Sequence, residues 1–189
     1  MRVDSREFRQ CLGQFATGVT VVTCRTEAGL HGATVNAFTA VSLDPPLVLV
    51  ALDRRAKVCG YITGRPFAVT VLDSDAHQMA LHFAGQQGHG AAVGWVDHEV
   101  APRIAGGLAW FACTPWASYD GGDHVLHVGL VQDCQRHPDG PDSRPLVFHG
   151  GEFRSVGEHL AGAPWLDTLD SPECDIGWVL PRLTGSTAR

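Results

Sequence analysis

Hydrophobic residues in this chain fall mostly into short runs with the spacing of β-strands. Val19–Cys24 is rich in β-branched residues and leads into the turn residues Glu27–Gly29, a pattern that predicts a β-hairpin re-entering near Gly32. Further strand candidates are Phe67–Leu72, Leu108–Thr114, His124–Val131 and Leu146–His149. A total of about six or seven strands predicts a mainly β fold, a closed or nearly closed antiparallel barrel with short flanking helices.

The clearest apolar run, Leu47–Leu52, follows a turn at Asp44–Pro46. Pro46 has no amide hydrogen to donate, and Pro45 favours extended backbone at Asp44, so the turn is expected directly ahead of the strand. Because no polar residue interrupts the run, we expect this strand to be buried on both faces.

Small residues, one asparagine and two threonines occupy much of the segment from Gly32 to Thr39, ahead of that turn. Small side chains let a flat ligand approach the backbone closely, so that main-chain amides can bind it. The alternative interpretation is a tight turn capped by the side chain of Asn36.

Helical patterns are few and short. Asp4 can cap a helix that runs to Phe15, and Glu7 stands three positions later, as in a capping box. The apolar stripe of this helix consists of Phe8, Leu12 and Phe15. Two more short helices are expected, one ending at Ile62 and one after Ser74 that buries Met79, Ala80 and Phe83. Loops are expected at Gly85–Gly94 and Pro115–Asp123.

Length and composition are those of a globular protein. The chain has 189 residues, of which 44% are hydrophobic and 18% charged, which fits one domain with an appendage. No apolar run approaches the roughly 20 residues that cross a bilayer, so no membrane association is expected. The segment Met1–Glu7 is charged and lacks the apolar core of a secretion signal, and we therefore expect a cytoplasmic protein.

The net charge of −6 is unevenly distributed. Ser155–Trp178 contains five acidic residues and no lysine or arginine, and prolines recur from Pro164 to Pro181. We therefore expect a folded domain over residues 1–154 and an acidic, irregular extension over residues 155–189. Since the rest of the chain is close to neutral, nothing indicates nucleic-acid binding.

The six cysteines are scattered and form no C-x-x-C pair, which favours buried free thiols. The close histidine pair, His124 and His127, is three residues apart in a predicted strand, so the two side chains point to opposite faces. We therefore expect no metal site.

Several motifs occur in an order that carries more information than any one of them. They are Phe15–Thr23, Gly32–Leu52, Phe67–Val69, Phe83–Ala84 and Gly122–His124 followed by Gly129. In this order they resemble the short-chain flavin reductases, the reductase components of two-component flavin monooxygenases. The resemblance covers roughly residues 5–154 and implies the FMN-binding split barrel, usually a homodimer with the flavin near the subunit interface.

The resemblance also implies a site. The segment matching Ala33–Ala37 lies along the isoalloxazine ring in that family, and the histidine matching His124 lies near the flavin and the incoming nicotinamide. Hydride transfer needs no protein acid or base at the two exchanging atoms, so we expect His124 to position rather than to perform the chemistry. The expected flavin contacts are Thr17, Gly18, Ala33, Thr34, Val35, Asn36, Ala37, Leu52, Asp53 and Phe83.

The chain departs from the family in two places. Relatives usually carry a Ser-x-Thr pattern that binds the flavin phosphate, whereas this chain has Ala56 and Val58 there, with Lys57 between them. Arg54, Arg55 and Lys57 can supply positive charge instead, and arginine can bind phosphate through two parallel hydrogen bonds. The alternative is a solvated basic loop. The second departure is Gly88–Val93, which lacks the charged and aromatic element of relatives.

The leading hypothesis is an NAD(P)H-dependent flavin reductase that supplies reduced FMN or FAD to a partner monooxygenase. The choices between FMN and FAD and between NADH and NADPH stay open, because no nicotinamide fingerprint follows a strand. One alternative is a flavin-dependent oxidoreductase or oxygenase acting directly on an organic substrate in a biosynthetic pathway. Another is a non-catalytic split-barrel module that binds flavin or haem, motivated by the missing hydroxyls at positions 56 and 58.

Overall fold

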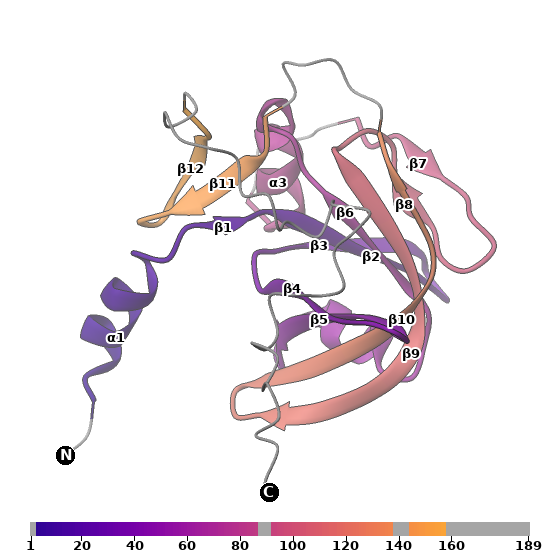
Figure 1. The fold of residues 1–189 in the computed structure, drawn as a ribbon, viewed down its shortest axis with the longest axis horizontal. Helices are drawn as coiled ribbons and strands as arrows, with labels where there is room; N and C mark the ends of the chain where they lie inside the picture. Colours follow the sequence, from indigo (N-terminus) through magenta and orange to yellow (C-terminus); the bar gives the residue numbers. More distant parts are fainter. Residues whose placement is uncertain (1–2, 87–91, 138–143, 158–189) are drawn as a thin grey trace, which may run out of the picture. The chain divides into compact units, whose positions relative to one another are not determined.

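The computed structural model of the chain describes residues 3–86, 92–137 and 144–157 (Figure 1). Its helical elements are α1 (Ser5–Leu12), α2 (Lys57–Ile62), η1 (Ser74–Ala76) and α3 (His77–Phe83). Its strands are β1 (Thr17–Gly18), β2 (Thr20–Thr26), β3 (Gly29–Val35), β4 (Phe38–Leu43), β5 (Pro46–Asp53), β6 (Phe67–Val71), β7 (Trp95–Val96), β8 (Arg103–Ile104), β9 (Ala109–Gly121), β10 (His124–Arg136), β11 (Leu146–His149) and β12 (Glu152–Ser155). The predicted mainly β class is confirmed.

Seven antiparallel strands form the main sheet in the order β3-β2-β6-β9-β10-β5-β4 (Figure 1). The two edge strands, β3 and β4, follow each other in the chain and are separated only by Asn36 and Ala37. The two ends of the sheet therefore lie together, and the sheet curls into a barrel that is split between β3 and β4. A smaller sheet of β1, β11 and β12 and the β7–β8 hairpin complete the described strands.

Two clusters of buried apolar residues hold the described elements in place. The first includes Val50, Phe67, Val69 and Cys113 from the main sheet together with Ile62 of α2. The second joins β2 to α3 and β8 through residues such as Val19, Val21, Ala80 and Ile104. Alternate residues of β2 thus pack on opposite sides of the sheet, with Val22 and Cys24 in the first cluster and Val21 in the second, as the period of two in a strand requires.

The burial of strand β5 differs from the predicted burial on both faces. Val48, Val50 and Leu52 are buried, but the alternate residues are only partly buried, and Leu49 and Ala51 line a cavity. The strand is therefore not buried on both faces. An apolar run does not distinguish a face packed in the core from a face that borders a cavity, because both favour hydrophobic side chains.

The β9–β10 hairpin is longer than the sequence pattern predicts. The predicted loop Pro115–Asp123 is mostly strand, because β9 continues to Gly121. Pro115 pairs with Gly129 and Ala117 with Val128, so Trp116 is the extra residue of a bulge. Proline is tolerated at a bulge, where the ladder does not need its missing amide hydrogen.

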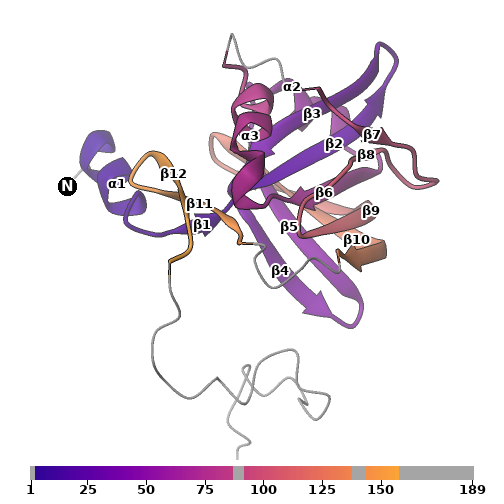
Figure 2. The same cartoon turned by 90° about the horizontal axis from the view of Figure 1, so that it is seen from above.

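Helix α1 begins as predicted but packs differently. The Asp4 carboxylate accepts hydrogen bonds from the amides of Arg6 and Glu7 at 3.0 and 2.9 Å. The apolar stripe of Phe8, Leu12 and Phe15 is 53%, 55% and 75% exposed. Figure 2 shows α1 beside the small sheet, away from the barrel strands. Amphipathic spacing predicts a helix here, but the helix ends at Leu12 rather than at Phe15, and within the described residues most of its apolar face is uncovered.

The cysteine prediction holds in part. Cys24, Cys59 and Cys113 are buried free thiols, and burial raises the pKa of Cys24 to about 11 and of Cys113 to about 12. Cys11 and Cys134 are exposed, contrary to expectation. Cys174 lies outside the described residues, as do residues 87–91 of the predicted glycine-rich loop and most of the predicted acidic extension. No helix in the described part of the chain is long and apolar enough to cross a membrane.

Candidate functional site

Three segments predicted to share a site lie side by side at one end of β5. The Ala51 amide donates a hydrogen bond to the Ala37 carbonyl at 3.0 Å, which ties the β3–β4 link to β5. On its other side β5 pairs with β10, where Asp53 stands opposite His124 and Leu52 opposite Val125. The link, the end of β5 and the start of β10 therefore form one continuous surface.

Strand β3 offers one unpaired edge. Among the described strands it pairs with β2 alone, so its other edge carries backbone groups without a strand partner. Two of its side chains have structural contacts: the Thr34 hydroxyl donates to the Ala80 carbonyl at 2.6 Å, and Val35 is 7% exposed. Both side chains therefore serve the packing of the fold, and what β3 leaves open at this edge is its backbone.

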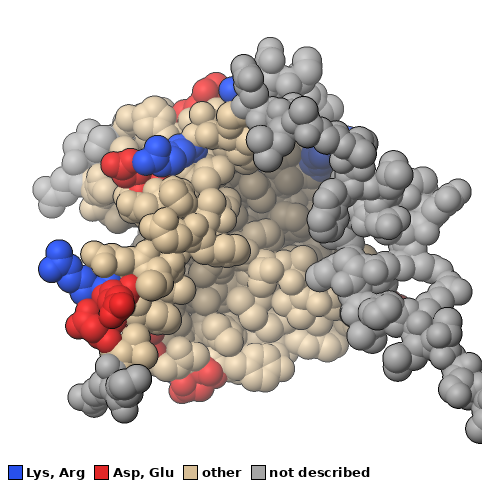
Figure 3. All heavy atoms as spheres, turned by 60° about the vertical axis from the view of Figure 1, so that its left-hand side comes forward, with Lys and Arg blue, Asp and Glu red and all other residues tan. Residues whose placement is uncertain are grey.

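A cavity of about 870 Å³ borders the β3–β4 link, and we call it the β4 cavity. Of the predicted site residues it contains Thr17, Asn36 and Ala37, and the Asn36 side-chain amide donates to the Thr17 hydroxyl at 3.3 Å. Its other walls are mainly apolar and come from Leu12, Phe15, Phe38, Leu49, Ala51 and Phe148, with Arg9, Gly13, Thr39 and Gly151 completing the lining. Figure 3 shows a hollowed face whose described surface is mostly neither acidic nor basic.

A second cavity, of about 550 Å³, lies over β3 between the start of α2 and the end of α3, and we call it the α2–α3 cleft. It brings together Ala33, Ala56, Lys57 and Phe83 from the predicted set. Part of the predicted flavin set is therefore divided between two cavities, one over β3 and one beside the link that follows it. The remaining predicted residues are not among the described lining residues of either cavity: Gly18, Thr34, Val35, Leu52, Asp53, Arg54 and Arg55.

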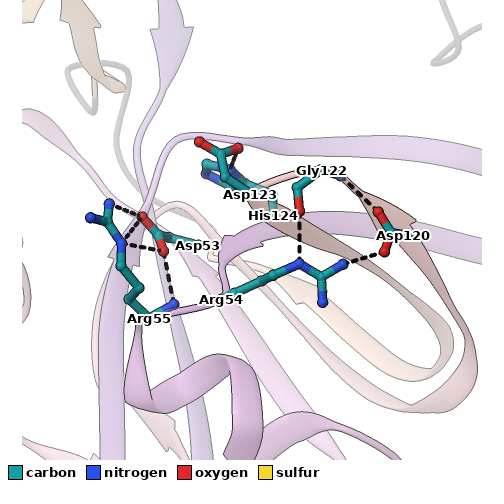
Figure 4. Close-up of polar contacts among 7 residues, drawn as sticks. All are labelled: Asp53, Arg54, Arg55, Asp120, Gly122, Asp123 and His124. Atoms are coloured by element: carbon teal, nitrogen blue, oxygen red, sulfur yellow. Dashed lines mark hydrogen bonds and ion pairs between the residues drawn. The ribbon is translucent and has the colours of Figure 1, made fainter.

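The two arginines of the basic loop already have anionic partners (Figure 4). The Asp53 carboxylate accepts hydrogen bonds from the Arg55 amide and side chain at 2.6 to 3.2 Å, which holds the pKa of Asp53 well below its usual range. Arg54 donates through Nε to the Gly122 carbonyl and through Nη2 to Asp120 Oδ2, both at 2.7 Å. Lys57, in contrast, forms no ion pair with any residue in ranges 3–86, 92–137 and 144–157.

The β9–β10 turn is hydrogen-bonded to the same basic loop. The Arg54 amide donates to the Asp123 carbonyl at 3.0 Å, and Gly122 has a φ of +78°, a conformation that favours glycine. His124 Nδ1 lies 2.7 Å from Asp123 Oδ1, and this hydrogen bond lowers the pKa of the Asp123 carboxyl. The His124 side chain is 40% exposed and is not among the described lining residues of either cavity.

Several residues of this region are absent from the predicted site set. His31 and Trp95 line the α2–α3 cleft, and burial together with the nearby Lys57 charge lowers the pKa of His31. His127 is 2% exposed, with Nδ1 at 3.0 Å from Ser118 Oγ and Nε2 at 3.6 Å from Cys59 Sγ. It thereby connects β10 to α2. The alternation that places His31 on the same face as Ala33 was the available signal.

Comparison with known proteins identifies the family. Residues 12–157 match the model of the flavin reductase like domain. The chain belongs to this family. It is 44% identical over 168 residues to an NADH-dependent flavin reductase of a Rhodococcus species, a match that covers 86% of this chain and 93% of that one. It is 37% identical over 150 residues to the reductase component of 4-hydroxyphenylacetate 3-monooxygenase from Thermus thermophilus, covering 79% and 95%.

Solved structures of flavin reductases share the fold. Flavin reductase PheA2 superposes with a TM-score of 0.77 at 35% identity, covering 82% of this chain and all of that one. The resemblance inferred from the motif order and the split-barrel type of fold are therefore confirmed for this flavin reductase.

Proposed function

We propose that this flavin reductase uses NADH to reduce FMN or FAD and supplies the reduced flavin to a partner monooxygenase component. The observation that carries the proposal is the position of Ala33–Ala37, which runs along the unpaired edge of β3 into the link between the two cavities. The names of relatives support the donor and the role, since they include NADH-dependent flavin reductases and monooxygenase reductase components.

The residues present fit a flavin. The β4 cavity is mainly apolar, and Asn36 and Ala37 bring small side chains and backbone amides to it, which suits a planar ring with one polar edge. Lys57, the first residue of α2, has no ion-pair partner among the described residues and supplies a positive charge for the flavin phosphate in the α2–α3 cleft. We propose that Thr17 and Gly18 border the ring and that Lys57 replaces the hydroxyls that relatives carry at positions 56 and 58.

A flavin in this site would accept a hydride at N5 from nicotinamide C4. The protein's task is to hold the two rings in contact and to exclude water. We propose that His124 borders the nicotinamide side. Its hydrogen bond to Asp123 orients the ring, and the contacts of Arg54 with Gly122 and Asp120 hold the turn that carries it.

We further propose that the flavin reductase acts as a homodimer. The exposed stripe of Phe8, Leu12 and Phe15 is apolar, and Leu12 and Phe15 also line the β4 cavity. A second copy that covers this stripe would remove the apolar surface from water and close the cavity beside Asn36 and Ala37. Light scattering during size-exclusion chromatography should give twice the mass of the 189-residue chain.

The direct test is NADH oxidation at 340 nm by the purified protein with added FMN or FAD. We expect rapid oxidation that depends on both protein and flavin, and faster turnover with NADH than with NADPH. A rate no higher than that of the protein-free mixture would contradict the function. Transfer is tested by adding a flavin-dependent monooxygenase component: product should form only when the reductase, NADH and flavin are all present.

A further inference from the structure

A buried histidine of β10 joins the main sheet to helix α2. The His127 side chain is 2% exposed, and its Nε2 atom lies 3.6 Å from the Sγ atom of Cys59, a buried residue of α2. Its other ring nitrogen, Nδ1, lies 3.0 Å from the hydroxyl oxygen of Ser118 on β9. The three side chains therefore form one hydrogen-bonded chain that runs from β9 through β10 to α2.

The three groups are neutral near pH 7. Burial lowers the pKa of the His127 imidazole and raises the pKa of the Cys59 thiol. The pair is therefore not the thiolate and imidazolium of a nucleophilic cysteine. Either neutral tautomer of His127 uses both ring nitrogens, because a thiol and a hydroxyl can each donate or accept a hydrogen bond. These contacts thus suit a role in holding structural elements together.

The start of α2 lacks a side-chain cap. Ala56, its N-cap residue, makes no capping hydrogen bond through its side chain. Val58 and Ile62, which are buried with Cys59 on the same helix, pack in the first apolar cluster. Apolar packing is non-directional, whereas a hydrogen bond requires a defined distance and angle. The contact between Cys59 and His127 therefore adds a directional restraint on the buried side of α2.

The strand end of this contact is held on both sides. His127 stands opposite Val50 of β5 and opposite Ser118 of β9, so β10 is paired with two strands at this residue. The helix end of the contact lies two residues after Lys57, which lines the α2–α3 cleft. A displacement of Cys59 would therefore move Lys57 relative to the sheet.

We propose that His127 is a positioning residue: through Cys59 it holds the start of α2, and with it Lys57, in the place where the flavin phosphate binds. The inference rests on the proposed function, which assigns the phosphate to Lys57. His127 is not among the described lining residues of either cavity, so it acts on the ligand through the helix. Its loss should therefore weaken binding of flavins that carry a phosphate and spare riboflavin.

Two substitutions of His127 separate the roles of its ring nitrogens. Glutamine can place its amide near the position of Nε2 and keep the bond to Cys59, whereas asparagine can reach only the position of Nδ1 and keep the bond to Ser118. The dissociation constant of oxidised FMN is measured without NADH by quenching of flavin fluorescence, with riboflavin as the comparison. We expect His127→Asn to raise the constant for FMN about 3- to 10-fold, as the loss of one hydrogen bond allows, and His127→Gln to change it less than twofold. The constant for riboflavin should change less than twofold in both variants.

Cys59 provides the reciprocal test. Cys59→Ala should raise the dissociation constant of FMN as much as His127→Asn does, and Cys59→Ser, which keeps a hydrogen-bonding group, should restore most of the affinity. In NADH oxidation the KM for FMN should follow the same order, with kcat changing less than twofold. Cys113→Ala is the matched control, since Cys113 is a buried free thiol of the same apolar cluster that lies on β9 rather than in α2. It should lower the melting temperature and leave both flavin constants unchanged.

Several results would overturn the inference. Equal FMN constants for His127→Asn and His127→Gln would show that the bond to Cys59 does not position the helix. An equal rise for riboflavin and FMN would indicate a general loss of structure. Should the His127 variants fail to fold, Cys59→Ala and Cys59→Ser still decide. No NADH oxidation by the unmodified protein would overturn the proposed function and this inference with it, whereas unaltered FMN binding in an active His127→Asn variant overturns the inference alone.

Discussion

Replacing Lys57 by alanine tests which cation binds the flavin phosphate. Arg54 forms a hydrogen bond with Gly122 and an ion pair with Asp120, and Arg55 forms an ion pair with Asp53. Lys57 has no ion-pair partner among the described residues. A hydrogen bond to a charged group contributes about 1.5–3 kcal/mol, and the exposure of Lys57 reduces this to about 1–2 kcal/mol. The expected rise in the KM for FMN is therefore about 5- to 30-fold.

Riboflavin provides the specific readout, because it has the ring of FMN but no phosphate. In the NADH oxidation assay, Lys57→Ala should raise the KM for FMN by that factor, with kcat and the KM for riboflavin changing less than twofold. Arg25→Ala is the matched control, since Arg25 pairs with Asp97 outside both cavities. The reasoning is refuted if riboflavin is affected as much as FMN, or if Arg55→Ala raises the KM for FMN more than Lys57→Ala does.

Three further predictions follow from contacts in the structure. Arg54→Ala should lower kcat severalfold with a smaller change in the KM for flavin, because it removes the hydrogen bonds that hold the turn carrying His124. Asp120→Ala should show part of the same loss in kcat. An effect on KM alone would contradict the role of Arg54 in holding this turn. Gly129→Ala should cost about 1–3 kcal/mol of unfolding free energy in urea, since its Cβ would lie 2.6 Å from Phe67 Cζ and 2.8 Å from Cys113 Cβ. Gly60→Ala, with nothing within 4 Å in helix α2, should be neutral or stabilising, and equal losses for the two variants would exclude the packing explanation. Burial and the Lys57 charge lower the pKa of His31, so the folded state favours its neutral form, and the free energy of unfolding falls as pH drops from about 6.5 through the native pKa. Binding of FMN should raise the pKa of His31 in an NMR titration. An unchanged pKa would argue against phosphate binding beside His31.

The strand pattern predicted most of the fold because it depends on local alternation. Val19–Cys24 and Phe67–Leu72 appear as β2 and β6 with shifts of at most two residues at their ends. The hairpin of β9 and β10 was only half predicted, because Pro115 indicates a loop in isolation. Its place in a strand depends on the bulge at Trp116 opposite Gly129, which is a pairing between distant residues.

Helix α1 likewise has a local feature that the sequence predicts and a tertiary feature that it does not. Its start follows from Asp4, whose carboxylate accepts the amides of the first turn whatever surrounds the helix. What covers its stripe depends on another element or another copy of the chain, and spacing along the helix does not encode that. Phe8 and Leu12 lie in the helix as the spacing predicts, whereas Phe15 follows the end of the helix, and all three are exposed among the described residues.

The sequence by itself determined the family, because the order of the motifs is a property of the chain alone. It also predicted Ala33–Ala37 as the segment that approaches the flavin, because the small residues there are a local property. The tertiary structure alone decided which positively charged side chains are available to bind a ligand. It pairs Arg54 with Asp120, which lies far along the chain, and leaves Lys57 in a cleft between α2 and α3. The physical reason is that ion pairs and cavities arise where distant segments meet, and their energies depend on distance and burial rather than on order along the chain.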